Sequence, residues 1–204
     1  MSNDLEQFWN GDFGNQYHKR NVGCHESNVD MFRFIVDCNE MQVGSVLEFG
    51  AGTGQNLSAW KTLFPDVETI AVEINDQAVA ALHDSIKVNA TIQCSILDFQ
   101  PEITAELVLT KGLLIHIAPK DLPTAYEVLH ACTRKWLLVC EYYSPKPREI
   151  NYRGNEGKAW ARDFAGEIMD AYPDMALVHY GFVYHRDKYP QDDLTWFLME
   201  KTSG

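Results

Sequence analysis

The chain lacks any apolar run close to the roughly 20 residues needed to cross a bilayer. Its first residues are acidic, where a signal peptide would be basic and then apolar. We therefore expect a cytoplasmic protein with no membrane partner. At 204 residues, with 46% hydrophobic and 23% charged residues, the composition is that of an ordinary globular protein. We expect a single domain over residues 1–204, with a helical segment at 1–40 and an α/β core at 41–204.

Basic residues are also scarce. There are 17 Lys and Arg against 29 Asp and Glu, a formal net charge of −12. Nucleic-acid binding requires a surface that neutralises several phosphates, so we expect no nucleic-acid partner. Basic residues are locally enriched between Lys146 and Arg162. This enrichment suits a small anionic ligand, and a solvated loop explains it equally well.

Paired cysteines are missing as well. The five cysteines are scattered and form no Cys-x-x-Cys motif, which predicts free thiols. The seven histidines have no ligand spacing with cysteines or with one another, so no metal site is expected. The chain also has no internal repeat and no low-complexity segment.

What the chain does have is a glycine-rich turn between an apolar strand and a helix. Residues 46–56 read Val-Leu-Glu-Phe-Gly-Ala-Gly-Thr-Gly-Gln-Asn. Glycine allows positive φ and close approach of a ligand, and the helix that follows offers unpaired N–H groups. Dinucleotide folds use Gly-x-Gly-x-x-Gly. Here the third glycine comes one residue early, and an acid, Glu48, precedes the first.

Two further acids follow predicted strands. Glu73 ends the apolar stretch Thr69–Glu73 about 20 residues after the glycine turn, where nucleoside-binding α/β folds place a ribose-binding carboxylate. Asp98 follows the strand predicted over Thr91–Ser95, in a polar-apolar-apolar-acid sequence. A solvated acid is the alternative in both cases.

The periodicity predicts alternating strands and helices that end in a hairpin. This order predicts a Rossmann-like α/β fold, with a mostly parallel seven-stranded sheet, one antiparallel strand and helices on both faces. Residues 142–155 show no periodicity. The predicted strands are 45–49, 69–73, 91–95, 105–111, 136–141, 176–185 and 194–201, and the predicted helices include 29–36, 57–64, 77–85, 122–135 and 158–171.

These motifs together resemble the class I S-adenosylmethionine-dependent methyltransferases over nearly the whole chain. The resemblance implies S-adenosyl-L-methionine as cofactor, with Glu48 and the glycine turn holding its methionine part and Glu73 its ribose. It also implies that Asp98 accepts a hydrogen bond from the adenine amino group and that Leu97 or Phe99 covers the ring. It implies a cofactor site made of Tyr17, Arg20, Glu48, Gly50, Ala51, Gly52, Thr53, Gly54, Asn56, Glu73, Ile74, Asp98, Phe99, Lys111 and Gly112.

The acceptor is expected beyond the fourth and fifth predicted strands. The segment after Lys111 is not the Asn-Pro-Pro-Tyr signature of base or glutamine N-methyltransferases. It contains His116, a candidate base for a hydroxyl or amine, although a packing role is also common there. The other predicted acceptor residues, each with an ordinary loop or surface role as its alternative, are Tyr142, Tyr143, Arg153, Trp160 and Arg162.

The N-terminal segment Phe8–Asn21 mixes aromatic residues, glycines and polar groups without a helical face. With the Thr-Lys-Gly segment and the later Tyr-Arg-Gly, it is similar to the methylases associated with pseudaminic acid biosynthesis. That resemblance implies a lid in which Tyr17 and Arg20 close over the cofactor, and a nonulosonic acid or amino-sugar acceptor.

Other readings stay open from sequence. The acceptor could instead be another small carboxylate, an amine or a peptide, and the protein a monomer or a homodimer. A non-catalytic cofactor-binding protein is a second class. A nucleotide-dependent oxidoreductase is a third, disfavoured by the early third glycine and by the lack of a Tyr-x-x-x-Lys pair.

Overall fold

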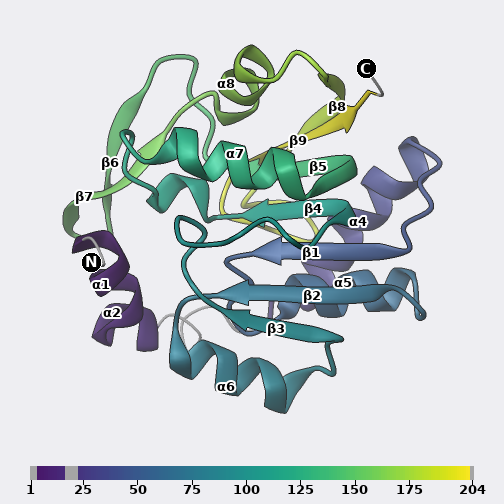
Figure 1. The fold of residues 1–204 in the computed structure, drawn as a ribbon, viewed down its shortest axis with the longest axis horizontal. Coiled ribbons are helices and arrows are strands. Elements are labelled where there is room, and N and C mark those ends of the chain that lie inside the picture. The colour runs from purple at the N-terminus through teal and green to yellow at the C-terminus, as the bar shows by residue number, and fades with distance from the viewer. Residues whose placement is uncertain (1–3, 17–22, 203–204) are drawn as a thin grey trace.

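The computed structural model describes residues 4–16 and 23–202. In this part of the chain, seven strands form one sheet in the order β3-β2-β1-β4-β5-β9-β8 (Figure 1). The strand β9 runs antiparallel to both of its neighbours, and the other pairs are parallel. The predicted sheet is therefore confirmed. Its strands are β1 Ser45–Phe49, β2 Glu68–Glu73, β3 Ala90–Gln93, β4 Ala105–Lys111, β5 Thr133–Glu141, β8 Met175–Val183 and β9 Leu194–Lys201.

Helices cover both faces of the sheet and form a separate apolar core on each side. One core packs α4 (His25–Cys38), α5 (Gln55–Leu63) and α6 (Asp76–Ser85) on the sheet, and the other packs α7 (Leu122–Cys132) and α8 (Phe164–Ala171). Two short helices, α1 (Asp4–Asn10) and α2 (Asp12–Asn15), lie beyond the carboxyl ends of the parallel strands (Figure 1). No helix in the described residues is long and apolar enough to span a membrane.

The central strand β1 is buried at every position, as expected for a parallel strand covered on both faces. Leu47 and Phe49 belong to the core beneath α7, whereas Val46 belongs to the core beneath α4 and α5. Each such side chain contributes about 1.5–3 kcal/mol when fully buried. Alternation along the strand puts Glu48 on the same face as Val46, and its carboxylate is therefore buried under α5.

The predicted boundary between α7 and β5 is wrong by three residues. The helix was expected to continue to Lys135, but it ends at Cys132 and the strand begins at Thr133. The Thr133 hydroxyl donates to the carbonyl of Leu129 at 2.7 Å, and Thr133 pairs with Ala105 of β4. Ladder pairing with β4 therefore overrides the helical pattern.

The segment after β5 holds a hairpin that the sequence pattern missed. Strands β6 (Arg148–Tyr152) and β7 (Asn155–Ala161) pair antiparallel outside the main sheet. Arg153 and Gly154 form their turn with φ of 52° and 85°, the sign that a two-residue hairpin turn requires. The helix expected from Lys158 therefore begins only at Phe164, where the side chain of Asp163 accepts from Gly166 N.

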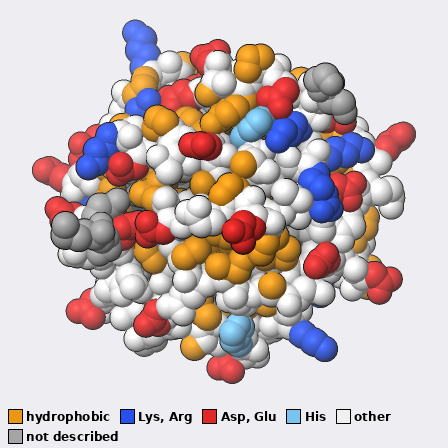
Figure 2. Space-filling view, viewed as in Figure 1, with side chains coloured by type: hydrophobic (Ala, Val, Ile, Leu, Met, Phe, Trp, Pro, Cys, Tyr) orange, Lys and Arg blue, Asp and Glu red, His pale blue; other side chains and the backbone are white. Residues whose placement is uncertain are grey.

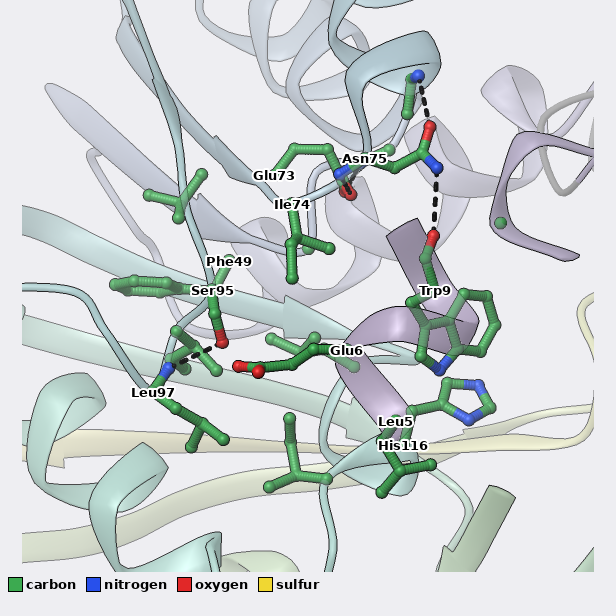
Figure 3. A pocket seen from close by; sticks show the side chains of 18 of the residues that line it. Leu5, Glu6, Trp9, Phe49, Glu73, Ile74, Asn75, Ser95, Leu97 and His116 are labelled. Carbon is green, nitrogen blue, oxygen red and sulfur yellow. Dashed lines mark hydrogen bonds between the residues drawn. The ribbon is translucent and has the colours of Figure 1, made fainter. Parts of the chain in front are cut away.

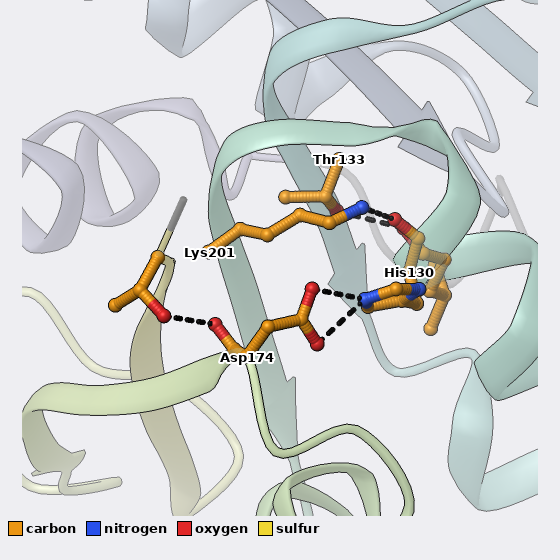
Figure 4. Close-up of polar contacts among 6 residues, drawn as sticks. His130, Thr133, Asp174 and Lys201 are labelled. Carbon is orange, nitrogen blue, oxygen red and sulfur yellow. Dashed lines mark hydrogen bonds and ion pairs between the residues drawn. The ribbon is translucent and has the colours of Figure 1, made fainter. Parts of the chain in front are cut away.

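At the amino end of β5, a polar cluster ties three segments together (Figure 4). His130 Nε2, at the end of α7, lies 2.8 Å from Asp174 Oδ2, just before β8. Lys201 Nζ, at the end of β9, donates to the carbonyl of His130 at 2.8 Å. The partly exposed His130 pulls the pKa of Asp174 below its usual value. This cluster secures the C-terminal strands at the edge of the sheet opposite α1.

Candidate functional site

The glycine turn joins β1 to α5 and is fastened to β2. Gly50 N and Ala51 N both donate to the carbonyl of Val72, at 2.8 and 3.1 Å. Gly54 has φ of 78°, and a Cβ there would lie 2.7 Å from Ile86 Cγ2. A side chain at this position would therefore strain the backbone and displace α6.

Glu73 lies at the carboxyl end of β2 with both oxygens in use. Gly52 N donates to Oε2 at 2.8 Å, and Asn75 N donates to Oε1 at 2.9 Å. Burial raises the pKa of Glu73, although these backbone donors oppose the rise. The carboxylate is thus pre-oriented by the glycine turn, and its remaining lone pairs face a cavity.

Glu48 is fully buried behind the turn. Asn56 Nδ2 donates to its Oε1 at 2.5 Å, while its Oε2 and the Oδ1 of Asn56 have no hydrogen-bond partner among the described residues. Burial raises the pKa of Glu48 to about 8. The group is therefore largely protonated near pH 7, and it holds Asn56 at the start of α5 behind the glycine turn.

Two adjoining cavities open at this edge of the sheet. The smaller, about 120 Å³, extends past Glu73 and Ile74 to the end of β3 (Figure 3). The larger, about 400 Å³, lies over Ala51, Thr53 and Asn56 and reaches Tyr142. The two linings share Gly14, Gly50, Gly52, Ala78, Lys111, Gly112 and His116. The glycine turn and the segment after β4 therefore separate two connected chambers.

The segment after β4 is held by a buried carboxylate at the end of β5. Glu141 accepts from the backbone N–H groups of Leu113, Leu114 and Ile115 at 3.1, 3.0 and 3.3 Å. Burial raises the pKa of Glu141 to about 7. This carboxylate fixes the wall between the chambers.

We predict that Glu141→Ala lowers the free energy of unfolding by about 3 kcal/mol at pH 7, because it leaves three buried N–H groups without an acceptor. Urea unfolding measures this. Arg134→Ala is the matched control at the opposite end of β5, where the guanidinium donates to Ser45 Oγ and the Thr104 carbonyl. A loss no larger than the control's would contradict the anchoring role.

His116 is buried on this wall. Its Nδ1 lies 2.8 Å from the carbonyl oxygen of Lys158, which can only accept, so Nδ1 carries the proton and Nε2 is left as an acceptor. Burial lowers the pKa of His116 to about 4. The ring packs against Trp9 and Tyr152, with centroids 4.3 and 4.6 Å away. His116 is therefore neutral near pH 7.

The N-terminal helices cover the cavities. Asn75 Nδ2 donates to the carbonyl of Trp9 at 3.0 Å and to Asn15 Oδ1 at 2.8 Å. Lys158 Nζ of β7 lies 4.9 Å from the ring centroid of Phe8. The structure thus joins α1, α2 and the β6–β7 hairpin over the site, consistent with a lid. The predicted lid residues Tyr17 and Arg20 lie outside the described residues.

Several predicted residues lie elsewhere. Asp98 is exposed, and Phe99 packs edge-to-face on Phe49 in the core, with centroids 5.0 Å apart. Arg162 Nη2 pairs with Glu167 Oε1 at 2.8 Å. Among the described residues, those predicted for the site but absent from both linings are Glu48, Gly54, Asp98, Phe99, Tyr143, Arg153, Trp160 and Arg162.

Other lining residues were not predicted. The smaller cavity includes Leu5, Glu6 and Trp9 of α1, with Cys94 and Ser95 after β3. The larger includes Tyr152, His185, Gln191 and Asp192. Gln191 Nε2 donates to the buried Asn28 at 2.9 Å, which ties the β8–β9 connection to α4. The aromatic-rich N-terminal segment was a usable signal for the α1 residues. The lining residues of the larger cavity come together only through tertiary contacts.

No protein-family model matches the chain, and no curated protein matches its sequence. Solved structures do resemble it. The 1,6-didemethyltoxoflavin-N1-methyltransferase of Burkholderia thailandensis has a TM-score of 0.72 at 19% identity, covering 94% of this chain and 86% of that one. The magnesium protoporphyrin IX methyltransferase of Synechocystis scores 0.69 at 12% identity, covering 97% and 98%.

An amino pentose methyltransferase of Micromonospora echinaspora, solved with S-adenosylmethionine bound, scores 0.64 at 13% identity, covering 94% of this chain and 97% of that one. At such low identity the likeness concerns the fold. The chain thus has the Rossmann-like fold of S-adenosylmethionine-dependent methyltransferases.

Proposed function

We propose that the protein transfers a methyl group from S-adenosylmethionine to a small polar acceptor. The observation that carries this proposal is the carboxylate of Glu73, held by Gly52 N and Asn75 N at the rim of the smaller cavity. It is suited to two ribose hydroxyls.

The sulfonium of the bound cofactor supplies an electrophilic methyl group, so the protein mainly has to align the acceptor. Gly112 and His116 border both chambers, and Glu141 holds the backbone between them. Trp9 and Tyr152 pack on His116 and exclude water there. His116 Nε2 accepts a hydrogen bond from the acceptor and orients it.

The larger chamber has basic and acidic side chains in its lining, which suits a polar acceptor. Its ionisable side chains include Lys111, His185 and Asp192, while Arg162 is engaged by Glu167. On the face in Figure 2, basic side chains lie in small separate groups among acidic ones. Within this class, a nonulosonic acid or amino-sugar precursor is the candidate that the sequence motifs support. Another carboxylate, an amine or a peptide is the alternative.

The test uses S-adenosylmethionine with a deuterated methyl group, mixed with the protein and metabolite pools rich in nonulosonic acids, amines or short peptides. Mass spectrometry then locates the label, with Glu73→Ala as the inactive control. A labelled product supports the proposal and identifies the acceptor. If S-adenosylhomocysteine binds but none of these pools becomes labelled, methyl transfer to these acceptors is refuted and a binding protein without turnover remains.

With the acceptor in hand, His116→Ala is expected to lower the rate about 100-fold. Because the pKa of His116 is lowered to about 4 by burial, the wild-type rate should show no step near pH 6.5 from this group. His130→Ala, at the opposite edge of the sheet, is the control. An undiminished rate in His116→Ala would remove this residue from the mechanism.

A further inference from the structure

The two edges of the seven-stranded sheet differ in length. The edge strand β3 has 4 residues, whereas β8 at the other edge has 9 and lies beside β9 (Figure 1). Among the described residues, β9 is the only strand that pairs with β8. The outer side of β8 therefore presents backbone N–H and C=O groups with no strand beside them, which is a template for pairing with another chain.

Soluble proteins usually prevent such pairing with short edge strands, with Lys or Pro on the edge, or with bulges. In β8 the register shifts once, between Leu177 and His179, and pairing with β9 is regular from His179 to Val183. No Asp, Glu, Lys, Arg or Pro occurs between Met175 and Tyr184. The stretch His179–Val183 is therefore open to a partner strand.

Aromatic side chains cover one face of this edge. Tyr180 lies opposite Phe197 of β9, with ring centroids 6.1 Å apart, and the ring of Phe197 lies 5.7 Å from that of Tyr143. Alternation puts Phe182 on the same face as Tyr180, and the Phe182 ring lies 6.3 Å from that of Tyr184. Tyr180 and Phe182 are 62% and 58% exposed. These five rings form what we call the β8 aromatic patch.

The area of this patch approaches what a stable dimer needs. An aromatic side chain can bury about 150–250 Å², and four of the five rings belong to residues that are about half exposed. With the exposed Leu177 and Val178, the patch offers on the order of 500 Å² of apolar surface. A standard interface buries about 800 Å² per partner, and the backbone edge of β8 adds to the apolar area.

The distribution of charge favours a second copy of this chain as the partner. The formal net charge is −12, so two copies repel each other over most of their surfaces. The uncharged stretch from Met175 to Tyr184 lets two copies meet without opposing acids. Antiparallel pairing about a two-fold axis is self-complementary. It would set Tyr180 and Phe182 beside the same residues of the other copy, and aromatic cross-strand pairs stabilise antiparallel strands.

We propose that the protein is a two-fold symmetric homodimer in which His179–Val183 of β8 pairs antiparallel with the same stretch of a second copy. This inference is independent of the proposed function. The antiparallel junction makes the parallel strands of the two sheets point in opposite directions. The two cavities of each copy therefore open at opposite edges of the joined sheet, and neither copy covers the site of the other.

Light scattering coupled to gel filtration, at about 50 μM protein, tests the proposal above the micromolar range of the weaker standard interfaces. The wild type should have the mass of two chains. The double variant Tyr180→Lys, Phe182→Lys should be a monomer, because it sets like charges opposite each other. These lysines reduce the net negative charge, so overall repulsion does not explain a monomer. The matched control, Gln77→Lys with Ala80→Lys at exposed positions of α6, should remain a dimer.

A milder variant separates loss of association from loss of folding. Tyr180→Thr with Phe182→Thr keeps residues that favour strands and should raise the dimer dissociation constant about 10-fold or more. Circular dichroism checks the fold of every variant. In the wild type, hydrogen exchange of the amides in His179–Val183 should become faster after about 100-fold dilution, because dilution separates the copies.

Three results would overturn the proposal. A monomeric wild type at about 50 μM would leave β8 to a different partner. A dimer that survives the two lysines would assign the interface to another surface. A dimer whose β8 amides exchange at the same rate before and after dilution would mean that the copies associate without joining their sheets.

Discussion

Replacing Glu73 with alanine is expected to weaken S-adenosylhomocysteine binding at least 100-fold. The carboxylate is held by Gly52 N and Asn75 N at 2.8 and 2.9 Å, and its lone pairs face the cavity. Each hydrogen bond to a charged group contributes about 1.5–3 kcal/mol, and two ribose hydroxyls would be lost together. The substitution also frees Gly52 N, so the glycine turn loses one of its fastenings. Titration calorimetry at pH 7 measures the effect.

Two variants sharpen this result. Glu73→Gln keeps one acceptor oxygen and should lose less affinity than alanine does. Glu68→Ala, at the exposed start of the same strand, should bind like the wild type. Binding by Glu73→Ala that matches the wild type would mean that this carboxylate does not hold the ribose.

Replacing Glu48 with glutamine is expected to stabilise the ligand-free protein at pH 8 by several kcal/mol relative to the wild type. Burial raises the pKa of Glu48 from 4.5 to about 8, at about 1.36 kcal/mol per unit, or about 5 kcal/mol. The unfolded chain ionises first as the pH rises, so the wild type loses stability between about pH 4.5 and pH 8. Glutamine carries no such cost.

Urea unfolding at several pH values tests this difference. The curves of the wild type and Glu48→Gln should converge near pH 4 and separate toward pH 8. Glu141, whose pKa burial raises to about 7, titrates in both proteins and cancels in the comparison. Parallel curves would show that Glu48 titrates normally.

The sequence alone was sufficient to predict which turn, strand end and helix start form the base of the site. The glycine turn, the acid Glu73 and the helix start at Asn75 are local features, because turn chemistry and strand patterns act over a few residues. Parallel strands then bring their carboxyl ends to one edge of the sheet. For that reason Gly50, Gly52, Glu73 and Lys111 could be assigned to one site without coordinates, and the structure brings them together there.

Only the tertiary structure decided what covers the site and which charges remain available in it. Glu6 and Trp9 reach the cavity because Asn75 and His116 hold α1 there, and Arg162 is engaged by Glu167. The β6–β7 hairpin was missed because β6 has no buried residue and β7 buries only two alanines, Ala159 and Ala161, which leave little alternating pattern. From the sequence, His116 is a candidate base that titrates near neutral pH, whereas burial lowers its pKa to about 4 and keeps the ring neutral. Such properties depend on residues far apart in the chain, which local periodicity does not record.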